Sequence, residues 1–164
     1  MFAQLHDRIL LIDADLRRPN CHAILGRDRG PGLAEVLTGL RKLDEAIQPT
    51  ALGGLFLLSA GETPPHPTEL LASQRMYEIL AVAASSYQHV LIDSPPILPL
   101  SDSVVLSTLV DGVVVVASSE TVKTLVRDAC GRLSYVGSKM LGVVLTKVDP
   151  KRQREPSPYY RSYS

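Results

Sequence analysis

The sequence predicts an α/β fold in three layers, with helices on both faces of a mostly parallel sheet. Short runs rich in Ile, Leu and Val alternate along the chain with longer segments of helical spacing. Two of the runs, at residues 9–13 and 89–93, are almost wholly apolar until they end in Asp13 and Asp93. Such runs are typical of strands buried on both faces of a parallel sheet, and ligands bind beyond the carboxyl ends of these strands.

The predicted elements can be placed in chain order. The predicted strands cover residues 9–13, 55–59, 89–93, 112–117 and 140–146. The predicted helices cover residues 32–38, 42–47, 67–86, 102–108 and 121–136. The helix that begins at Pro67 is the clearest, because the missing N–H of proline would have no partner at the first helical position anyway. Within it, Leu70, Met76 and Leu80 keep roughly helical spacing.

Composition limits the class of protein and its partners. A chain of 164 residues has room for one domain with a real core. Its 17 Lys and Arg balance 17 Asp and Glu, so no net charge recruits nucleic acid or an anionic membrane. Cys21 and Cys130 are far apart, which favours free thiols in a reduced, cytoplasmic chain. No run approaches the roughly 20 apolar residues of a transmembrane helix, and no signal peptide is expected.

The last residues form a predicted disordered tail. From residue 150 to residue 164 the chain is polar and interrupted by proline, with too few apolar groups to offset the entropy of ordering. Tyr159, Tyr160 and Tyr163 lie in this tail. Composition alone slightly favours the interpretation that these tyrosines have no function.

Three carboxylates are expected at one edge of the sheet. Asp13 and Asp15 are two residues apart, so on an extended chain they lie on the same side and need a cation or a proton to relieve their repulsion. Asp93 ends another strand and is followed by Ser-Pro-Pro, which stops that strand. Taken singly, Asp13 or Asp15 could equally be a helix cap. Together they favour Mg²⁺ beside the phosphates of a nucleotide, because Mg²⁺ prefers carboxylate oxygens.

A phosphate-binding loop does not accompany these carboxylates. The sequence contains no G-x-x-x-x-G-K-[ST] motif, since residues 26–32 lack the lysine and residues 137–139 have the wrong order. Residues 2–5 look like the end of the helix that would follow such a loop. We therefore expect the sheet to lack its first strand, which leaves a gap or an unprotected edge prone to aggregation. We also expect the 164-residue chain alone to bind ATP poorly.

Several motifs occur in the same order as in one known family. They are L-L-I-D-A-D-L-R-R-P at residues 10–19, G-L-A-E-V-L at 32–37, S-A-G-E-T-P-P-H-P-T-E-L-L at 59–71, V-L-I-D-S-P-P at 90–96, V-D-G-V-V-V-V at 110–116 and G-V-V-L at 142–145. The chain resembles the bacterial tyrosine kinases of capsule and exopolysaccharide export over residues 1–149. The proline-rich run separates this family from the partition and septum-positioning ATPases that share its sheet. The resemblance implies a P-loop NTPase type of fold, here an incomplete kinase domain over residues 1–149.

The resemblance also implies roles for single residues. Asp93 would hold Mg²⁺ through a water, and Asp13 would share that metal shell. Asp15 is the candidate base for the tyrosine hydroxyl, with Asp13 as its rival. Arg17 or Arg18 would touch a phosphate or a neighbouring subunit, although a solvated pair of arginines is as good an interpretation.

The remaining implied roles lie nearer the end of the chain. Thr146, Lys147 and Asp149 occupy the position at which such folds bind adenine, although Thr146 replaces the expected asparagine. Tyr159, Tyr160 and Tyr163 would be phosphoacceptors. The implied cofactors are ATP and Mg²⁺, and the implied partners are a membrane chain-length (co-polymerase) protein and further copies of the kinase. The expected location is the cytoplasm, at the inner face of the bacterial plasma membrane.

Three interpretations of function remain open at this point. The chain is a fragment of an autophosphorylating tyrosine kinase, or a protein with a misassigned start, which has little activity alone. Alternatively, it is a partition-type ATPase, which the proline-rich run and the tyrosine tail disfavour. The third interpretation is a non-catalytic partner or phosphoacceptor of an intact kinase.

Overall fold

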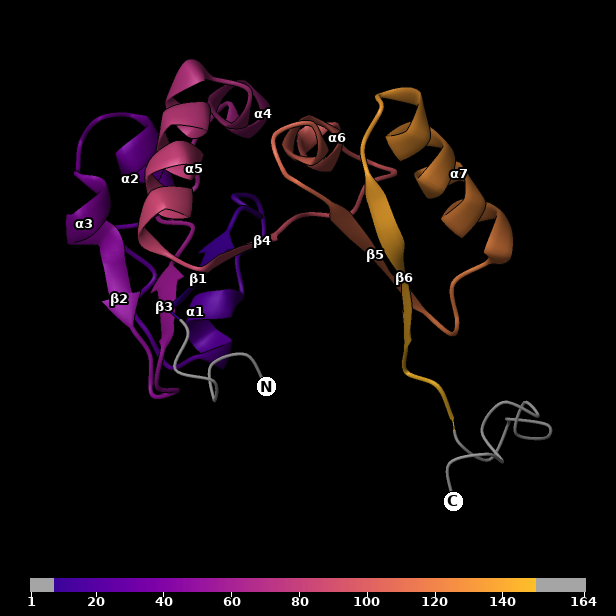
Figure 1. Ribbon diagram of the computed structural model, residues 1–164, viewed down its shortest axis with the longest axis horizontal. Helices are drawn as coiled ribbons and strands as arrows, with labels where there is room; N and C mark the ends of the chain where they lie inside the picture. The colour runs from indigo at the N-terminus through magenta and orange to yellow at the C-terminus, as the bar shows by residue number, and fades with distance from the viewer. Residues whose placement is uncertain (1–7, 150–164) are drawn as a thin grey trace. The chain divides into compact units, whose positions relative to one another are not determined.

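The computed structural model describes residues 8–149, which form two compact units that divide after Val110 (Figure 1). The predicted disordered tail, its three tyrosines and the helix end expected at residues 2–5 lie outside the described residues. Each unit is an α/β arrangement with at least one pair of parallel strands. The predicted α/β class is therefore confirmed.

The first unit contains a four-stranded sheet with the order β2-β3-β1-β4. Its strands are β1 (Ile9–Asp13), β2 (Ile47–Pro49), β3 (Leu55–Leu58) and β4 (His89–Asp93). β1 runs parallel to β3 and to β4, whereas β2 is antiparallel to β3. The sheet is thus mostly parallel, as predicted, and β2 is an element that the sequence analysis missed.

β1 is the central and most deeply buried strand of this unit. Leu10 and Ile12 have no exposed surface, and they pack in one core with Leu58 of β3. The helices that add side chains to this core are α2 (Leu33–Leu37), α3 (Leu43–Ala46), α4 (Pro67–Leu71), α5 (Gln74–Ser86) and α6 (Asp102–Ser107). Burial of this apolar surface holds the carboxyl end of β1 at a fixed place.

The predicted helix over residues 67–86 is wrong as a single helix. The chain breaks it into α4 and α5, which point in different directions (Figure 1). Ser73 is the cause, because its hydroxyl accepts a hydrogen bond from the N–H of Met76 (3.4 Å) and caps α5. A further short helix, α1 (Cys21–Ile24), was not predicted.

Glu35 joins the loop before α2 to the loop after β3. Its carboxylate accepts hydrogen bonds from the N–H of Gly32 (2.7 Å) and the N–H of Glu62 (3.0 Å). A Cβ atom on Gly32 would lie 2.3 Å from the carbonyl oxygen of Ser59, closer than any real contact. The glycine and the glutamate of the G-L-A-E-V-L motif therefore have a structural explanation.

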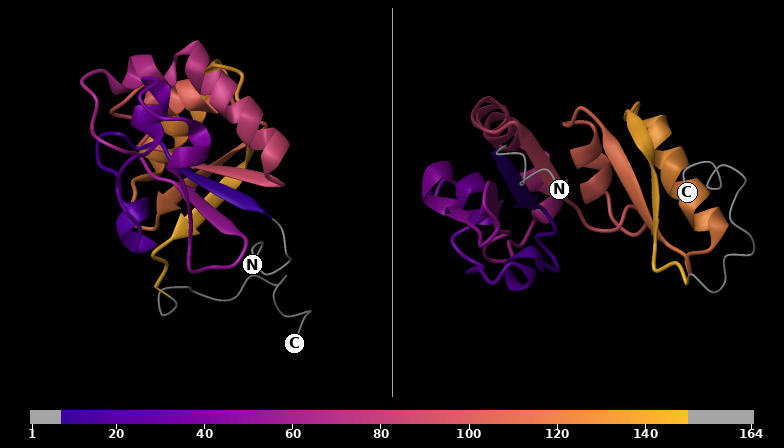
Figure 2. Two further views of the ribbon diagram at one scale, coloured as in Figure 1. Left: turned by 90° about the vertical axis from the view of Figure 1, so that its left-hand side faces the viewer. Right: turned by 60° about the horizontal axis from the view of Figure 1, so that its bottom comes forward.

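The second unit is a parallel pair, β5 (Val113–Ser118) and β6 (Met140–Thr146), with helix α7 (Lys123–Tyr135) along one face (Figures 1 and 2). Val115 and Ala117 are buried, as are Ala129 and Leu133 of α7. In contrast, Val116 is 66% exposed. None of the helices in the described part of the chain is both long and apolar enough to cross a membrane.

Open strand edges are present among the described strands of both units. Among the described strands, β4 pairs only with β1, and β5 and β6 pair only with each other. The expectation that β4 would be buried on both faces is wrong. Leu91 is 49% exposed, because no described strand lies on the outer side of β4.

The contact at Gly32 gives the first test. We expect Gly32→Ala to lower the free energy of unfolding by about 1–3 kcal/mol, the usual cost of overpacking, because the new methyl group meets rigid backbone. Chemical denaturation measures this change. Gly53→Ala is the matched control, since nothing lies within 4 Å of a Cβ atom at that position. Equal effects of the two substitutions would contradict the explanation.

The exposed face of β5 gives the second test. We expect Val116→Lys to leave stability within about 0.5 kcal/mol and to reduce association of the chain at high concentration, because it places a charge on an exposed apolar strand. Val115→Lys is the matched control, because the side chain of Val115 is only 6% exposed. That control should unfold the second unit. Light scattering and thermal unfolding distinguish the two variants, and equal loss of folding in both would refute the assignment of faces.

Candidate functional site

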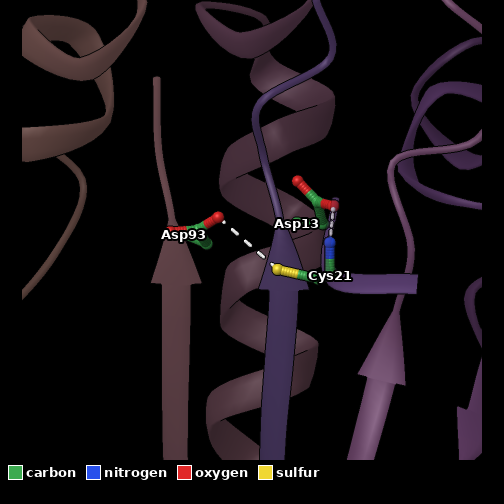
Figure 3. A group of neighbouring side chains, drawn as sticks. All are labelled: Asp13, Cys21 and Asp93. Atoms are coloured by element: carbon green, nitrogen blue, oxygen red, sulfur yellow. Dashed lines mark hydrogen bonds between the residues drawn. The ribbon is translucent and has the colours of Figure 1, made fainter. Parts of the chain in front are cut away.

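The carboxyl ends of β1 and β4 bring two aspartates together, as predicted. Asp13 and Asp93 are partners in the parallel register of these strands. Cys21, the first residue of α1, lies beside them (Figure 3). One ligand atom from each of the three side chains lies within 4.8 Å of the other two. The site therefore combines two carboxylates with a thiol.

Asp13 is completely buried and is held by the backbone that follows it. Its carboxylate accepts hydrogen bonds from the N–H groups of Asp15 (3.3 Å), Asn20 (3.2 Å) and Cys21 (3.0 Å). These bonds fold residues 14–20 into a loop over the end of β1. Because a carboxylate has about four acceptor positions, Asp13 can still face a cation.

Cys21 shares a hydrogen bond with Asp93. The thiol donates to the carboxylate, and Sγ lies 3.4 Å from Oδ2. Burial, reinforced by the negative charges of Asp13 and Asp93, raises the pKa of Cys21 to about 12. The sequence predicts only an ordinary free thiol at Cys21. The contact could not be foreseen, because nothing in the spacing of Cys21 and Asp93 indicates proximity.

Asp93 is exposed at the end of its strand. The surrounding chain shields part of its carboxyl from water, and the carboxylates of Asp13 and Asp15 lie nearby. The pKa of Asp93 is therefore raised above its ordinary value, even though the Cys21 thiol donates to it. Excess negative charge of this kind is relieved by a bound divalent cation.

Asp15 lies in the loop that follows β1. Its carboxylate accepts hydrogen bonds from the N–H groups of Arg17 (3.2 Å) and Arg18 (2.9 Å). Asp15 is partly exposed, whereas Asp13 is not exposed at all. Of the two candidate bases, Asp15 is therefore the one that an incoming hydroxyl can reach, and its catalytic role stays a prediction.

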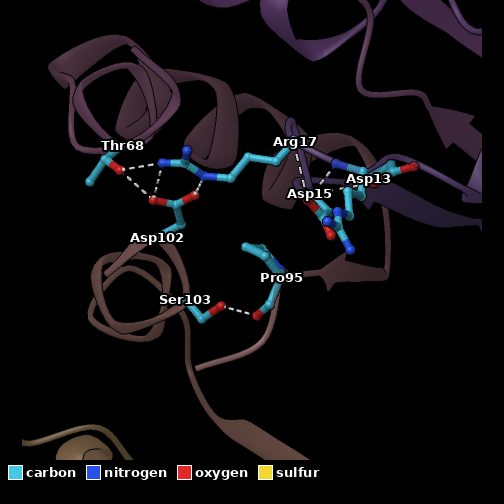
Figure 4. Close-up of polar contacts among 8 residues, drawn as sticks. Asp13, Asp15, Arg17, Thr68, Pro95, Asp102 and Ser103 are labelled. Atoms are coloured by element: carbon cyan, nitrogen blue, oxygen red, sulfur yellow. Dashed lines mark hydrogen bonds and ion pairs between the residues drawn. The ribbon is translucent and has the colours of Figure 1, made fainter. Parts of the chain in front are cut away.

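Arg17 is held by an ion pair that the sequence analysis did not foresee. Its Nε lies 2.8 Å from a carboxylate oxygen of Asp102, and the guanidinium also donates to the hydroxyl of Thr68 at 3.1 Å (Figure 4). Thr68 in turn donates to Asp102. The Arg17 side chain remains 37% exposed, so its predicted contact with a phosphate or a subunit stays a prediction.

Asp102 anchors this network in α6. Its side chain is only 1% exposed. Burial opposes its ionisation, but the hydrogen bonds from Arg17 and Thr68 outweigh burial and hold the pKa of Asp102 below its ordinary value. The next residue, Ser103, donates a hydrogen bond to the carbonyl of Pro95 (Figure 4). Helix α6 thus fixes the loops that follow both β1 and β4.

The other predicted site residues lie in the loop after β1 and in the second unit. Arg18 is exposed. Thr146, Lys147 and Asp149 belong to the second unit, where the Ser119 hydroxyl donates to the carbonyl of Lys147 (2.6 Å). Their predicted role in binding adenine stays a prediction.

The donor set fits one implied group and not the other. Two carboxylates from neighbouring strands suit Mg²⁺, which takes oxygen ligands and keeps several waters. The β- and γ-phosphates of ATP need a cradle of backbone N–H groups with a lysine. The sequence has no G-x-x-x-x-G-K-[ST] motif to supply it. The two carboxylates therefore suit a bound Mg²⁺, but the sequence has no phosphate-binding loop to accompany them.

Comparison with solved structures identifies the family. The kinase domain of VpsO is 36% identical, with a TM-score of 0.84, and the match covers 90% of this chain and 73% of that one. The chain belongs to the bacterial tyrosine-protein kinase family. The kinase domain of the Escherichia coli tyrosine kinase ETK agrees, with 33% identity, a TM-score of 0.89 and coverage of 95% and 62%.

More distant and longer relatives complete the comparison. The septum site-determining protein MinD of Pyrococcus horikoshii, solved with Mg-ADP, is 22% identical, with a TM-score of 0.75 over 96% of this chain and 65% of that one, which shows a shared fold. Tyrosine-protein kinase Wzc of Salmonella typhi is 36% identical over 90% of this chain. The chain spans only 21% of the length of that relative. A scan of protein-family models finds no match.

The pair of Arg17 and Asp102 gives a test of this site. We expect Asp102→Asn to lower the midpoint of thermal unfolding at neutral pH, because it removes the charge that the network of Arg17 and Thr68 stabilises. Because the pKa of Asp102 is lowered in the folded chain, its ionised carboxylate contributes stability at pH values above the ordinary pKa of aspartate, about 3.9. This contribution to stability is lost as the pH falls through the lowered pKa of Asp102. The variant and the parent should therefore converge in acid. Asp28→Asn, which changes an exposed aspartate of the same unit, is the control. A difference that persists unchanged in acid would contradict the assignment.

Proposed function

We propose that this chain is the cation-binding and base-containing part of an ATP-dependent protein-tyrosine autokinase of capsule or exopolysaccharide export. The observation that carries the proposal is the convergence of Asp13 and Asp93 beside the Asp15 loop, in a member of the bacterial tyrosine-protein kinase family. Mg²⁺, when bound, neutralises charge that develops on transferred phosphate. Asp13 and Asp93 hold the cation, partly through water. Asp15 accepts the proton of the incoming tyrosine hydroxyl.

In this proposal, the phosphate-binding loop is supplied by a segment outside these 164 residues. It carries a G-x-x-x-x-G-K-[ST] motif between a strand and a helix, on the same polypeptide or on another one. Thr146, Lys147 and Asp149 contact the adenine. Arg17 and Arg18 contact a phosphate or a neighbouring copy of the kinase, and Tyr159, Tyr160 and Tyr163 accept phosphate from such a copy. A membrane chain-length protein holds the kinase at the inner face of the plasma membrane.

A second candidate function is a non-catalytic phosphoacceptor of an intact kinase. The lack of a phosphate-binding lysine loop in the sequence favours it, because the chain then needs no ATP of its own. Adding an intact family kinase separates the two functions. In the second function the tail tyrosines gain phosphate only from the added kinase, and changing all three to Phe abolishes the signal.

Adding the missing motif tests the first function. The chain alone should show weak Mg²⁺-dependent binding of ATP in calorimetry. A fusion with a strand, G-x-x-x-x-G-K-[ST] loop and helix placed before Met1 should bind ATP and produce phosphotyrosine. Replacing the loop lysine by Ala is the control and should remove both signals, whereas Asp15→Asn should reduce phosphotyrosine by about 100-fold or more with little change in ATP binding.

Two outcomes would count against this proposal. Tight, Mg²⁺-dependent binding of ATP by the 164-residue chain would show that the chain already contains a phosphate-binding site. A folded fusion that binds ATP and forms no phosphotyrosine would reject the kinase function.

A further inference from the structure

The thiol of Cys21 has no part in the proposed phosphoryl transfer, yet it lies among the residues that hold the cation. Cys21 is 9% exposed, and its sulfur comes from a third segment of the chain, the start of α1. Figure 3 shows the thiol next to the carboxylate of Asp93, with the carboxylate of Asp13 close by. The site therefore offers a sulfur donor that a magnesium site does not need.

The spacing of the donors suits one small ion. Sγ of Cys21 lies 3.4 Å from Oδ2 of Asp93, and atoms of all three side chains lie within 4.8 Å of one another. On a tetrahedral zinc ion, a sulfur ligand at 2.3 Å and an oxygen ligand at 2.1 Å are about 3.6 Å apart. The observed distance between sulfur and oxygen is close to this value, so a cation could bind both with little movement.

Two further features favour such a cation. Asp13 is completely buried, and its carboxylate is oriented by three backbone N–H groups. Asp93 is exposed, which leaves the group accessible from the end of β4. Ligand chemistry then determines the preference, since Mg²⁺ takes oxygen ligands whereas thiolate selects zinc and similar soft ions.

We propose that Cys21, Asp13 and Asp93 form a mixed sulfur and oxygen site that binds a thiophilic divalent cation of the zinc class in competition with Mg²⁺. The inference deepens the proposed function and rests on it, since the same carboxylates serve both cations. Binding exchanges the S–H bond of Cys21 for a metal–sulfur bond and releases the proton to solvent. No group changes its oxidation state.

Titration with Cd²⁺, a spectroscopic substitute for Zn²⁺, tests the site in the full 164-residue chain. Ultraviolet absorption reports the bond between cadmium and thiolate. In Cys130→Ser, which retains Cys21 as the only thiol, the band should saturate at one Cd²⁺ per chain. Cys21→Ser should lose that band, Asp93→Asn should weaken Cd²⁺ binding by about tenfold or more, and excess Mg²⁺ should raise the Cd²⁺ concentration needed. Circular dichroism checks that each variant is folded.

A measurement without substitutions supports the titration. Cd²⁺ should protect Cys21 from alkylation more than it protects Cys130, as mass spectrometry of the parent chain can show. The proposal is overturned if the cadmium band persists in Cys21→Ser, if Asp93→Asn leaves the affinity unchanged, or if excess Mg²⁺ has no effect. If the fusion forms phosphotyrosine but shows no cadmium band, only this inference is rejected. If it shows a cadmium band but forms no phosphotyrosine, only the kinase function is rejected.

Discussion

The buried carboxylate of Asp13 accepts hydrogen bonds from three backbone N–H groups within the eight residues that follow it, and the geometry of the site depends on this interaction. It turns the chain sharply at the end of β1, sets the start of α1 and places the Cys21 thiol next to Asp93. Burial makes the hydrogen bonds necessary, because an unpaired carboxylate without contact to water is costly. The same bonds make Asp13 a fixed support for a cation and a poor candidate for a mobile base.

A second network of hydrogen bonds, made by the Arg17 side chain, orients the loop that follows β1. Arg17 reaches from the loop to Asp102 and Thr68, and Thr68 belongs to the proline-rich run that marks the family. The motif D-A-D-L-R-R-P and the motif P-P-H-P-T-E-L-L therefore meet in space. Their coexistence in the sequence has a physical reason, because Arg17 of the first motif donates to Thr68 of the second, and both side chains donate to Asp102. The arginine that the sequence suggested for phosphate binding is also a structural link.

Much of the sheet could be predicted because its strands are short apolar runs with clear ends. The predicted limits of β1, β4 and β6 coincide with the observed ones. The break between α4 and α5 could not be predicted from spacing, since apolar residues continue at helical intervals across Ser73. Strand β2 has three residues and ends in proline, too little for a pattern. The contact between Arg17 and Asp102 joins residues 85 positions apart, and no local signal encodes it.

The free edge of β4 has a thermodynamic consequence for the cation. Any strand that pairs with that edge will lie alongside Asp93, the exposed member of the ligand group, and will reduce its contact with water. An ionised carboxylate becomes more costly as solvent is removed, and a bound cation compensates for that cost. Edge pairing and cation binding are therefore linked equilibria, and each must strengthen the other by the same factor. A chain that completes the sheet would then acquire a tighter cation site without any change in its ligands.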